Sequence, residues 1–255
     1  MSFDGQRVVI IGASAGIGEA TAKAFAERGA AVTMTGRSKE RLDQAAHRID
    51  RPVQAAHRID RPVQVAEVDA TDRAALDAFF AATGTVDHLA LAASPGAVGV
   101  GPIAGLDEAA LRQAFDGKFF AHVQAIQAAL PRLRAGGSVT IISAVSARVG
   151  FAGTAALAGV NGALEAIVRP LALELAPTRV NAVSPGVIDT PWWDGMPDDQ
   201  RRAYFEAAAA VTPVGRVGRP EDVAGAVVYL AGAGFVSGTV LECAGGAQLT
   251  VGALA

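Results

Sequence analysis

Seven short runs of apolar and β-branched residues alternate along the chain with longer alanine-rich segments, and this alternation constrains the fold more than any other feature. The strand-like runs are 7–12, 30–36, 63–69, 88–93, 138–143, 179–184 and 239–243. The helical segments include 19–28, 73–82, 109–133, 155–175 and 221–231. Continuously apolar strands that alternate with helices are typical of a parallel sheet covered on both faces. With right-handed crossovers, residues 1–255 are predicted to form a single doubly wound, Rossmann-type α/β domain, a three-layer sandwich around a mainly parallel seven-stranded sheet.

A glycine-rich segment follows the first apolar run and opens a helical stretch. Gly12, Gly16 and Gly18 are spaced G-x-x-x-G-x-G, a variant of the dinucleotide fingerprint. Glycine at these positions permits a tight turn, a close backbone approach to a pyrophosphate and close helix–strand packing. The N–H groups and the dipole of the helix start attract phosphate. The segment therefore predicts a nucleotide-binding site.

The end of the second strand-like run indicates which dinucleotide is bound. An NAD site places a carboxylate about 20 residues past the glycines, where it binds the ribose 2′-hydroxyl. This chain has Thr35, Gly36 and Arg37 instead. A guanidinium suits a 2′-phosphate through charge-assisted, bidentate bonds, whereas the alternative for Arg37 is a solvated surface charge. NADP(H) is therefore favoured over NAD(H).

Charge and cysteine content limit the partners and the compartment. The net charge is −3 and no run of Lys or Arg is present, which argues against nucleic acid and an anionic membrane surface as partners. The single cysteine, Cys243, forms no intrachain disulfide, and the sequence shows neither a signal peptide nor an apolar run of about 20 residues. We expect a soluble cytoplasmic protein without a membrane partner.

The ten residues AAHRIDRPVQ occur twice in tandem, at 45–54 and 55–64. The first copy is expected to end a helix that begins near Lys39, because Pro52 disfavours its continuation. The second copy is expected to lead into a strand, with a functionless surface loop or turn between them. His47 and His57 have no accompanying cluster of carboxylates or cysteines, so we expect no metal site.

Several segments, in the right order, resemble those of the short-chain dehydrogenase/reductase family. Besides the glycine segment, they are the turn at Asp69, the stretch RVNAVSPGVIDT (179–190), and the last helix and strand (218–232 and 236–246), where family subunits usually associate. The resemblance implies an oxidoreductase for a small carbonyl or alcohol substrate, assembled as a homodimer or homotetramer. It also implies that Asp69 lies by the adenine and that the Ile188 backbone meets the nicotinamide carboxamide.

The glycine pattern and the resemblance together give one set of expected cofactor-binding residues. They are Gly12, Ser14, Gly16, Ile17, Gly18, Arg37, Ser38, Asp69, Ala70, Ala92, Ala93, Ser94, Asn161, Pro185, Gly186, Ile188 and Thr190.

The chain departs from the family pattern where the chemistry takes place. Family members typically use Asn, Ser, Tyr and Lys, because hydride arriving at carbon leaves charge on an oxygen that must be hydrogen-bonded and protonated. Registered on the family's helix, Leu157 takes the tyrosine position and Asn161 the lysine position, and Ala144 takes the serine position. Lys118 takes the asparagine position, with Asp116 as the alternative.

Asn and Lys have thus exchanged helices, and Lys118 and Asn161 are the catalytic candidates. In the family these two side chains are linked through water, so the exchange preserves a polar pair. Partial desolvation would lower the pKa of Lys118 and suit it to proton donation or electrostatic stabilisation; in the alternative, the chain extends to solvent.

Three functions follow as hypotheses. The favoured one is an NADP(H)-dependent oxidoreductase with a non-standard proton donor. The others are a catalytically inactive NADP(H)-binding sensor or scaffold, and a non-redox enzyme, such as a lyase or isomerase, on the same fold.

Further candidates lie in a substrate lid at about 188–212 and in the nearby helix. In the lid, Tyr204 is a candidate proton donor, and Trp192 and Trp193 either wall a pocket for an apolar carbonyl compound or pack within the lid itself. His122 lies one helical turn after Lys118, where packing is the more usual role.

The remaining candidates follow the fifth strand-like run or lie outside the site. Arg148 either meets an anionic substrate or is a surface charge. Strand alternation points Ser143 to the other face, whereas Ser146, past the strand end, is able to curl back. Tyr229 is expected in the core.

Overall fold

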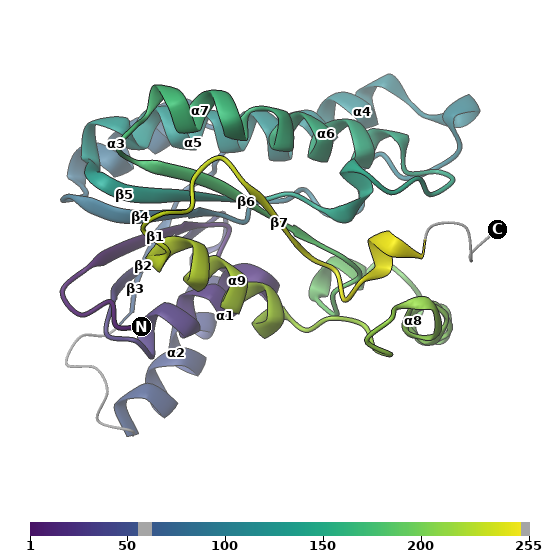
Figure 1. Cartoon of the computed structure of the whole chain (residues 1–255), viewed down its shortest axis with the longest axis horizontal. Coiled ribbons are helices and arrows are strands. Elements are labelled where there is room, and N and C mark those ends of the chain that lie inside the picture. Colours follow the sequence, from purple (N-terminus) through teal and green to yellow (C-terminus); the bar gives the residue numbers. More distant parts are fainter. Residues whose placement is uncertain (56–62, 251–255) are drawn as a thin grey trace.

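A parallel sheet of seven strands, in the order β3-β2-β1-β4-β5-β6-β7, forms the middle layer (Figure 1). The computed structural model describes residues 1–55 and 63–250. The strands are β1 (Arg7–Ile11), β2 (Ala31–Gly36), β3 (Gln64–Glu67), β4 (Val86–Leu91), β5 (Leu133–Ile142), β6 (Arg179–Pro185) and β7 (Val240–Cys243). All six neighbouring pairs are parallel. The predicted fold class and all seven predicted strands are confirmed.

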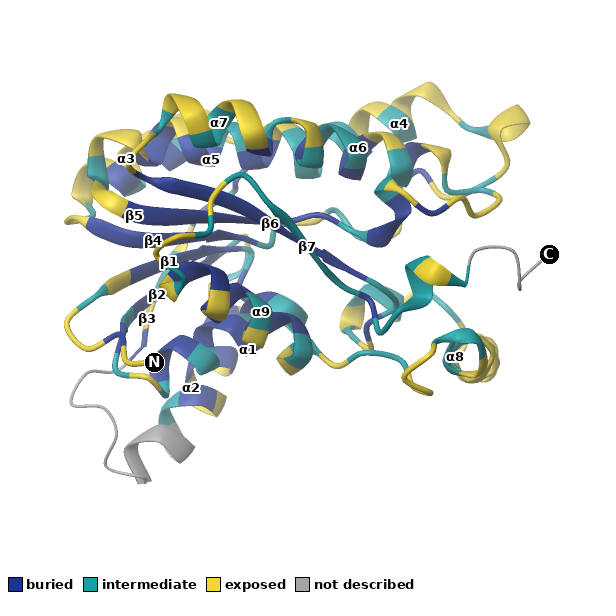
Figure 2. Cartoon of the chain, in the orientation of Figure 1, coloured by how far each residue is buried: buried dark blue, intermediate teal, exposed yellow. Residues whose placement is uncertain are grey.

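Helices cover both faces of the sheet (Figure 1). One face carries α1 (Gly16–Ala26), α2 (Lys39–Ala55) and α9 (Pro220–Gly232). The other carries α3 (Arg73–Ala82), α4 (Glu108–Ala114), α5 (Ala121–Ala129), α6 (Ala155–Ala166) and α7 (Val168–Glu174). Successive β1 residues enter opposite cores, Val8 and Ile10 on the first face and Val9 and Ile11 on the second. Because both faces of the central strands β1, β4 and β6 are buried, their sequences are largely apolar (Figure 2).

The long helix predicted over 109–133 is divided. Between α4 and α5 the backbone forms a π-helical segment, η2 (Phe115–Phe120). A π segment inserts an extra residue into the helical repeat and re-aims the side chains that it carries, and such segments are frequent at functional sites. Lys118 lies in this segment.

Other boundaries and burials differ from expectation. The helix α2 begins at Lys39 and ends at Ala55, one residue past the first repeat copy, so the prediction that this copy ends a helix begun near Lys39 is confirmed. The helix continues three residues past Pro52, and so near its end the lost backbone hydrogen bond is tolerated. The helix α8 (Asp198–Val211) lies inside the predicted lid. Residues 56–62, with most of the second repeat copy and His57, lie outside the described residues.

Tyr229 is not a core residue, because 51% of it is exposed. The buried stripe of α9 follows Val223, Val227 and Leu230, and Tyr229 lies beside this stripe on the outer face of the helix. Because Tyr229 has apolar neighbours in the sequence, the local pattern does not show on which face of the helix it lies.

One stretch in the described chain, Ala155–Glu174, has the length and apolar composition of a membrane span. It comprises α6 and α7, which break from one another at Ile167. Leu164 and Val168 belong to the core beneath it, and packing on the sheet accounts for the apolar composition of this side.

The strand order reverses direction between β1 and β4, because the chain first builds β2 and β3 on one side of β1 and then returns to the other. In open α/β sheets, ligands bind in the crevice at such a switch point, outside the carboxyl ends of the strands. The glycine segment follows β1 and the segment Ala92–Ser94 follows β4. The topology therefore places both at the expected binding edge.

The start of α3 gives a stability prediction. Asp72 Oδ1 accepts hydrogen bonds from the N–H groups of Ala74 (2.9 Å) and Ala75 (3.1 Å). Asp72→Ala removes this cap, and we expect the free energy of unfolding to fall by about 1 kcal/mol in urea titrations. Asp72→Asn retains an acceptor oxygen and is expected to lose less; equal stability of Asp72→Ala and the parent chain would contradict the assignment.

Candidate functional site

The glycine segment after β1 is packed so closely that side chains are excluded. Gly12 has φ +85°, and a Cβ there would lie 2.6 Å from the backbone nitrogen of Ala93. A Cβ on Gly18 would overlap the carbonyl oxygen of Gly12. The Gly12 N–H also donates to the Thr35 carbonyl at 3.0 Å, which ties the segment to the end of β2. These contacts explain why glycine, and no larger residue, occupies the turn.

The start of α1 has the properties of a phosphate site. The helix begins at Gly16, and within the described chain no side chain caps it. Its first N–H groups and its dipole are therefore left to attract an anion. A Cβ on Gly16 would lie 3.3 Å from Thr190 Cβ, so the glycine segment and the segment after β6 face one another. The residues fit a pyrophosphate approached by backbone alone.

Arg37 lies at the end of β2, beside the glycine segment. Its side chain is exposed, and among the described residues it has neither a hydrogen bond nor an ion pair. Gly36 lies against Ser14, and Ser38 Oγ accepts a hydrogen bond from the Arg41 N–H at 3.3 Å. The guanidinium is thus uncommitted where the 2′-phosphate of NADP(H) is expected.

The other expected cofactor residues lie along the same edge. Asp69 follows β3, where its Oδ1 accepts from both the N–H (2.9 Å) and the hydroxyl (2.8 Å) of Thr71, which fixes the turn before α3. After β6, the Gly186 N–H donates to the Cys243 carbonyl at 3.1 Å. The carbonyl of buried Ile188 accepts from the Trp193 indole at 2.9 Å and from the Thr190 hydroxyl at 3.5 Å.

Lys118 and Asn161 are in direct contact. Lys118 Nζ donates to Asn161 Oδ1 at 2.7 Å and to the Ser143 carbonyl at 3.3 Å. Asn161 Nδ2 donates to the Leu157 carbonyl at 2.9 Å and to Ser146 Oγ at 3.1 Å. The π segment and α6 thus bring together two residues that are 43 positions apart.

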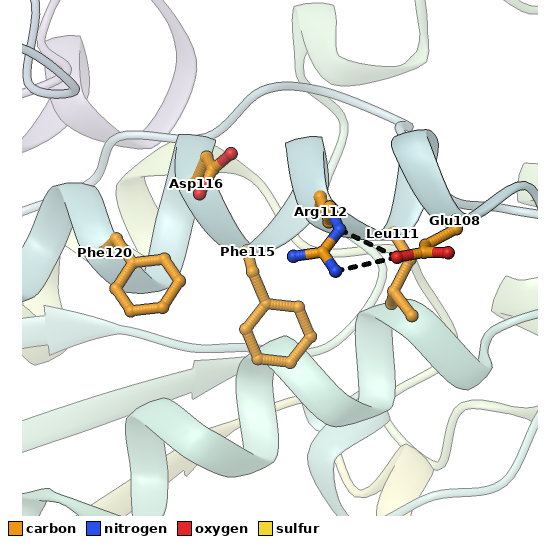
Figure 3. A pocket seen from close by; sticks show the side chains of 6 residues that line it. All are labelled: Glu108, Leu111, Arg112, Phe115, Asp116 and Phe120. Atoms are coloured by element: carbon orange, nitrogen blue, oxygen red, sulfur yellow. Dashed lines mark hydrogen bonds and ion pairs between the residues drawn. The ribbon is translucent and has the colours of Figure 1, made fainter.

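The geometry favours Lys118 over Asp116 as the residue that faces Asn161. Asp116 is exposed and lines an external groove of about 510 Å³ together with Phe115 and Phe120 (Figure 3). This groove lies over the outer side of α4 and η2, and Arg112 and Glu108 form an ion pair in it.

Burial controls the charge of Lys118. Desolvation lowers the pKa of its ammonium to about 8, and the negative charge of Glu165 limits the fall. Lys118 therefore does not extend to solvent, and both its protonation states are populated near pH 8.

The nearby hydroxyls are divided between two networks. Ser146 curls back from the turn after β5 and contacts Asn161, as the sequence allowed. Ser143 Oγ instead donates to Glu165 Oε1 at 2.8 Å, so it faces α6, the helix that carries Asn161, and the prediction that it points to the other face is wrong. Ser143 continues the phase of Val139 and Ile141, which face the core on this side of the sheet. The sequence interpretation missed Glu165, although its position four residues after Asn161 places both on one side of α6.

Arg148 is neither a free anion-binding group nor an isolated surface charge. Its guanidinium binds Glu165 Oε2 at 2.8 Å and Glu242 Oε1 at 2.5 Å. It is therefore not free to bind an anionic substrate, and it is an exposed surface charge that two carboxylates from distant segments neutralise.

The lid aromatics pack on one another. The Trp193 ring lies 4.9 Å from Tyr204 and 5.8 Å from Phe205, centroid to centroid, and 4.6 Å from Trp192. Arg201 joins α8 to the chain after β6 through Asp189 (2.5 Å). Burial raises the pKa of Tyr204, which makes its phenol a weaker acid. Packing within the lid is thus the arrangement that the structure shows.

Two further points complete the candidates. His122 is fully buried, and its Nε2 lies 3.0 Å from the Ala93 carbonyl oxygen. Within residues 1–55 and 63–250, no group of three or more His, Cys, Asp and Glu side chains has the arrangement of a metal site.

Known proteins resemble this chain over nearly its whole length. Residues 12–248 match a family described as enoyl-(acyl carrier protein) reductase. A short-chain dehydrogenase/reductase of Stachybotrys chlorohalonatus is 34% identical, over 96% of this chain and 98% of that protein. The cis-4-hydroxycyclohexanecarboxylate dehydrogenase of Sinomonas cyclohexanicum is 35% identical, over 96% and 97%.

Solved structures agree with these relatives. A small-chain dehydrogenase in complex with NADPH superposes with a TM-score of 0.81 at 30% identity, covering 96% of this chain and all of that one. The MalC reductase/Diels-Alderase of Malbranchea aurantiaca superposes with a TM-score of 0.87 at 29% identity, covering 97% and 98%.

The Lys118–Asn161 contact predicts how the lysine titrates. Asn161→Leu removes the oxygen that accepts from the ammonium, so we expect the pKa of Lys118 to fall below its value of about 8. Asn161→Asp places a carboxylate there, and the pKa should rise. The ζ-nitrogen resonance, assigned by its loss in Lys118→Gln, would be followed by NMR against pH. Identical titrations in both variants would contradict the contact.

Proposed function

Because the chain belongs to the short-chain dehydrogenase/reductase family, we propose that it is an NADP(H)-dependent oxidoreductase that interconverts a carbonyl and an alcohol with a non-standard proton donor. The observation that carries this proposal is the 2.7 Å hydrogen bond from Lys118 Nζ to Asn161 Oδ1. It supports the proposal because it joins an amine with a lowered pKa to Asn161, the residue that takes the family's lysine position by resemblance.

The retained binding edge supports NADP(H) as the cofactor. Gly12, Gly16 and Gly18 would hold the pyrophosphate by backbone, and Arg37 would bind the 2′-phosphate. Asp69 and Ile188 would meet the adenine and the nicotinamide carboxamide. The chemistry that bound NADP(H) supplies is hydride transfer.

In this proposal Lys118 supplies the charge and the proton. Reduction of a carbonyl leaves negative charge on oxygen, and a partly desolvated ammonium stabilises such charge and donates a proton to it. Asn161 holds the amine in place and is itself fixed by the Leu157 carbonyl and Ser146. Leu157 and Ala144 supply no hydroxyl in place of the family's tyrosine and serine.

We also propose the remaining properties from the family. The substrate is a small carbonyl or alcohol compound, as in the family. The assembly is a homodimer or homotetramer, and the compartment is the cytoplasm.

Two alternatives make different use of the same site. The absence of a hydroxyl at Leu157 and Ala144 favours either an NADP(H)-binding sensor or scaffold, or a non-redox enzyme. One similar structure carries a name with both a reductase and a Diels-Alderase activity. A sensor would bind NADPH without turnover across a panel of carbonyl compounds. A non-redox enzyme would form product without any change in nicotinamide absorbance.

Arg37 should determine the preference for the phosphorylated cofactor. Arg37→Ser removes charge-assisted bonds worth about 1.5–3 kcal/mol, so the Kd for NADPH should rise about 10- to 100-fold while that for NADH changes little. Calorimetric titration measures both constants. Arg41→Ser, one turn further along the chain in α2, makes the same charge change and should have little effect on the Kd for NADPH. A similar rise in this Kd in both variants would indicate a non-specific electrostatic attraction and not a bond from Arg37.

Lys118 should be needed for turnover but not for folding. Lys118→Met is expected to lower kcat for carbonyl reduction about 100-fold or more. In the parent enzyme, reduction should slow as pH rises through about 8, because the protonated amine is then lost. Asp116→Asn, on the same segment but facing the external groove, is the control. Unchanged kcat in Lys118→Met would exclude this role.

A further inference from the structure

His122 is a fully buried ionisable group for which the proposed chemistry has no use. It lies in α5, one turn after Lys118, and its exposed fraction is 0%. Placing an imidazole in the interior is unfavourable unless its nitrogens are hydrogen-bonded. The hydrogen bonds of the ring nitrogens therefore indicate what role the buried histidine has.

Only one of the two ring nitrogens has a partner among the described residues. Nε2 lies 3.0 Å from the Ala93 carbonyl oxygen, whereas buried Nδ1 has no hydrogen-bond partner there. Burial and the charge of Lys118 lower the pKa of His122 to about 3, so the ring is neutral. A carbonyl only accepts, so the single proton is on Nε2 and is donated to Ala93.

The Ala93 backbone lies between this ring and the glycine segment. The neighbouring Ala92 N–H donates to the Ile11 carbonyl at 2.8 Å, which continues the pairing of β4 with β1. On the other side, a Cβ on Gly12 would lie 2.6 Å from the Ala93 nitrogen. The space between Gly12 and Ala93 is therefore too narrow for a side chain, and the His122 bond restrains Ala93 from moving away from α5.

We propose that His122 is a positioning residue that holds the dinucleotide-facing segment Ala92–Ser94 in register with the helix that carries Lys118. The bond to Ala93 joins the two halves of the site, the glycine segment that would bind the cofactor and the Lys118–Asn161 pair. The inference rests on the proposed binding of NADP(H), and it adds a residue that touches neither substrate nor cofactor.

The test uses two variants with opposite expectations. His122→Leu fills the space but donates no hydrogen bond, and the Kd for NADPH should rise about fivefold to tenfold. His122→Gln places an amide N–H near the former Nε2 and should restore most of the affinity. Because His122→Leu also removes the unpaired Nδ1, its thermal midpoint should stay close to that of the parent chain.

A second buried histidine is the matched control. His88 lies in β4, toward the amino ends of the strands and away from the proposed binding site. Its ring contacts Ser138 Oγ (2.8 Å) and Gln6 Oε1 (2.6 Å). His88→Leu should reduce stability, because it leaves polar partners unpaired, but should leave the NADPH Kd unchanged.

The possible failures are distinguishable. If the parent chain binds no NADPH, the proposed function is wrong. If the parent binds it and His122→Leu binds equally tightly, the positioning role is wrong. The role is also overturned if His122→Gln is as weak as His122→Leu, or if affinity falls only in step with the thermal midpoint.

Discussion

Burial of the parallel sheet on both faces is the constraint on which the rest of the structure depends. Each strand must present apolar residues to two helical layers, so Val8 and Ile10 enter one core and Val9 and Ile11 the other. With side chains committed to the cores, only the carboxyl ends of the strands are left for polar groups. The glycine segment, Arg37, Asp69 and the segment after β6 therefore gather at one edge.

Two kinds of contact shape that edge. At the binding end, backbone lies so close to backbone that Gly12 and Gly18 are required, and the N-terminus of α1 stays open for an anion. At the chemical end, a π segment and α6 bring an amine to an amide, and desolvation lowers the pKa of Lys118 to about 8. His122 and Ala93 lie between the two ends.

Close packing also decides which charged groups are free to act. Arg148 is a candidate anion-binding group in the sequence, yet two carboxylates bind it. Arg37, at the end of β2, has no such partner in the described part of the chain. The difference between these arginines depends on residues distant in sequence. Glu242, from β7, binds the guanidinium of Arg148, and no such carboxylate binds that of Arg37 in the described part of the chain.

The sequence by itself determined the strands, the fold class and the place of the glycine segment, because hydrophobic alternation and glycine geometry are local properties. It also placed Lys118 and Asn161 by resemblance, with Asp116 as an alternative. Only the tertiary structure decided that Lys118 meets Asn161, that the Ser146 hydroxyl joins them and the Ser143 hydroxyl does not, and that Tyr229 faces outward. These outcomes depend on the phase of each helix and on contacts between residues far apart in the chain, which no local pattern encodes.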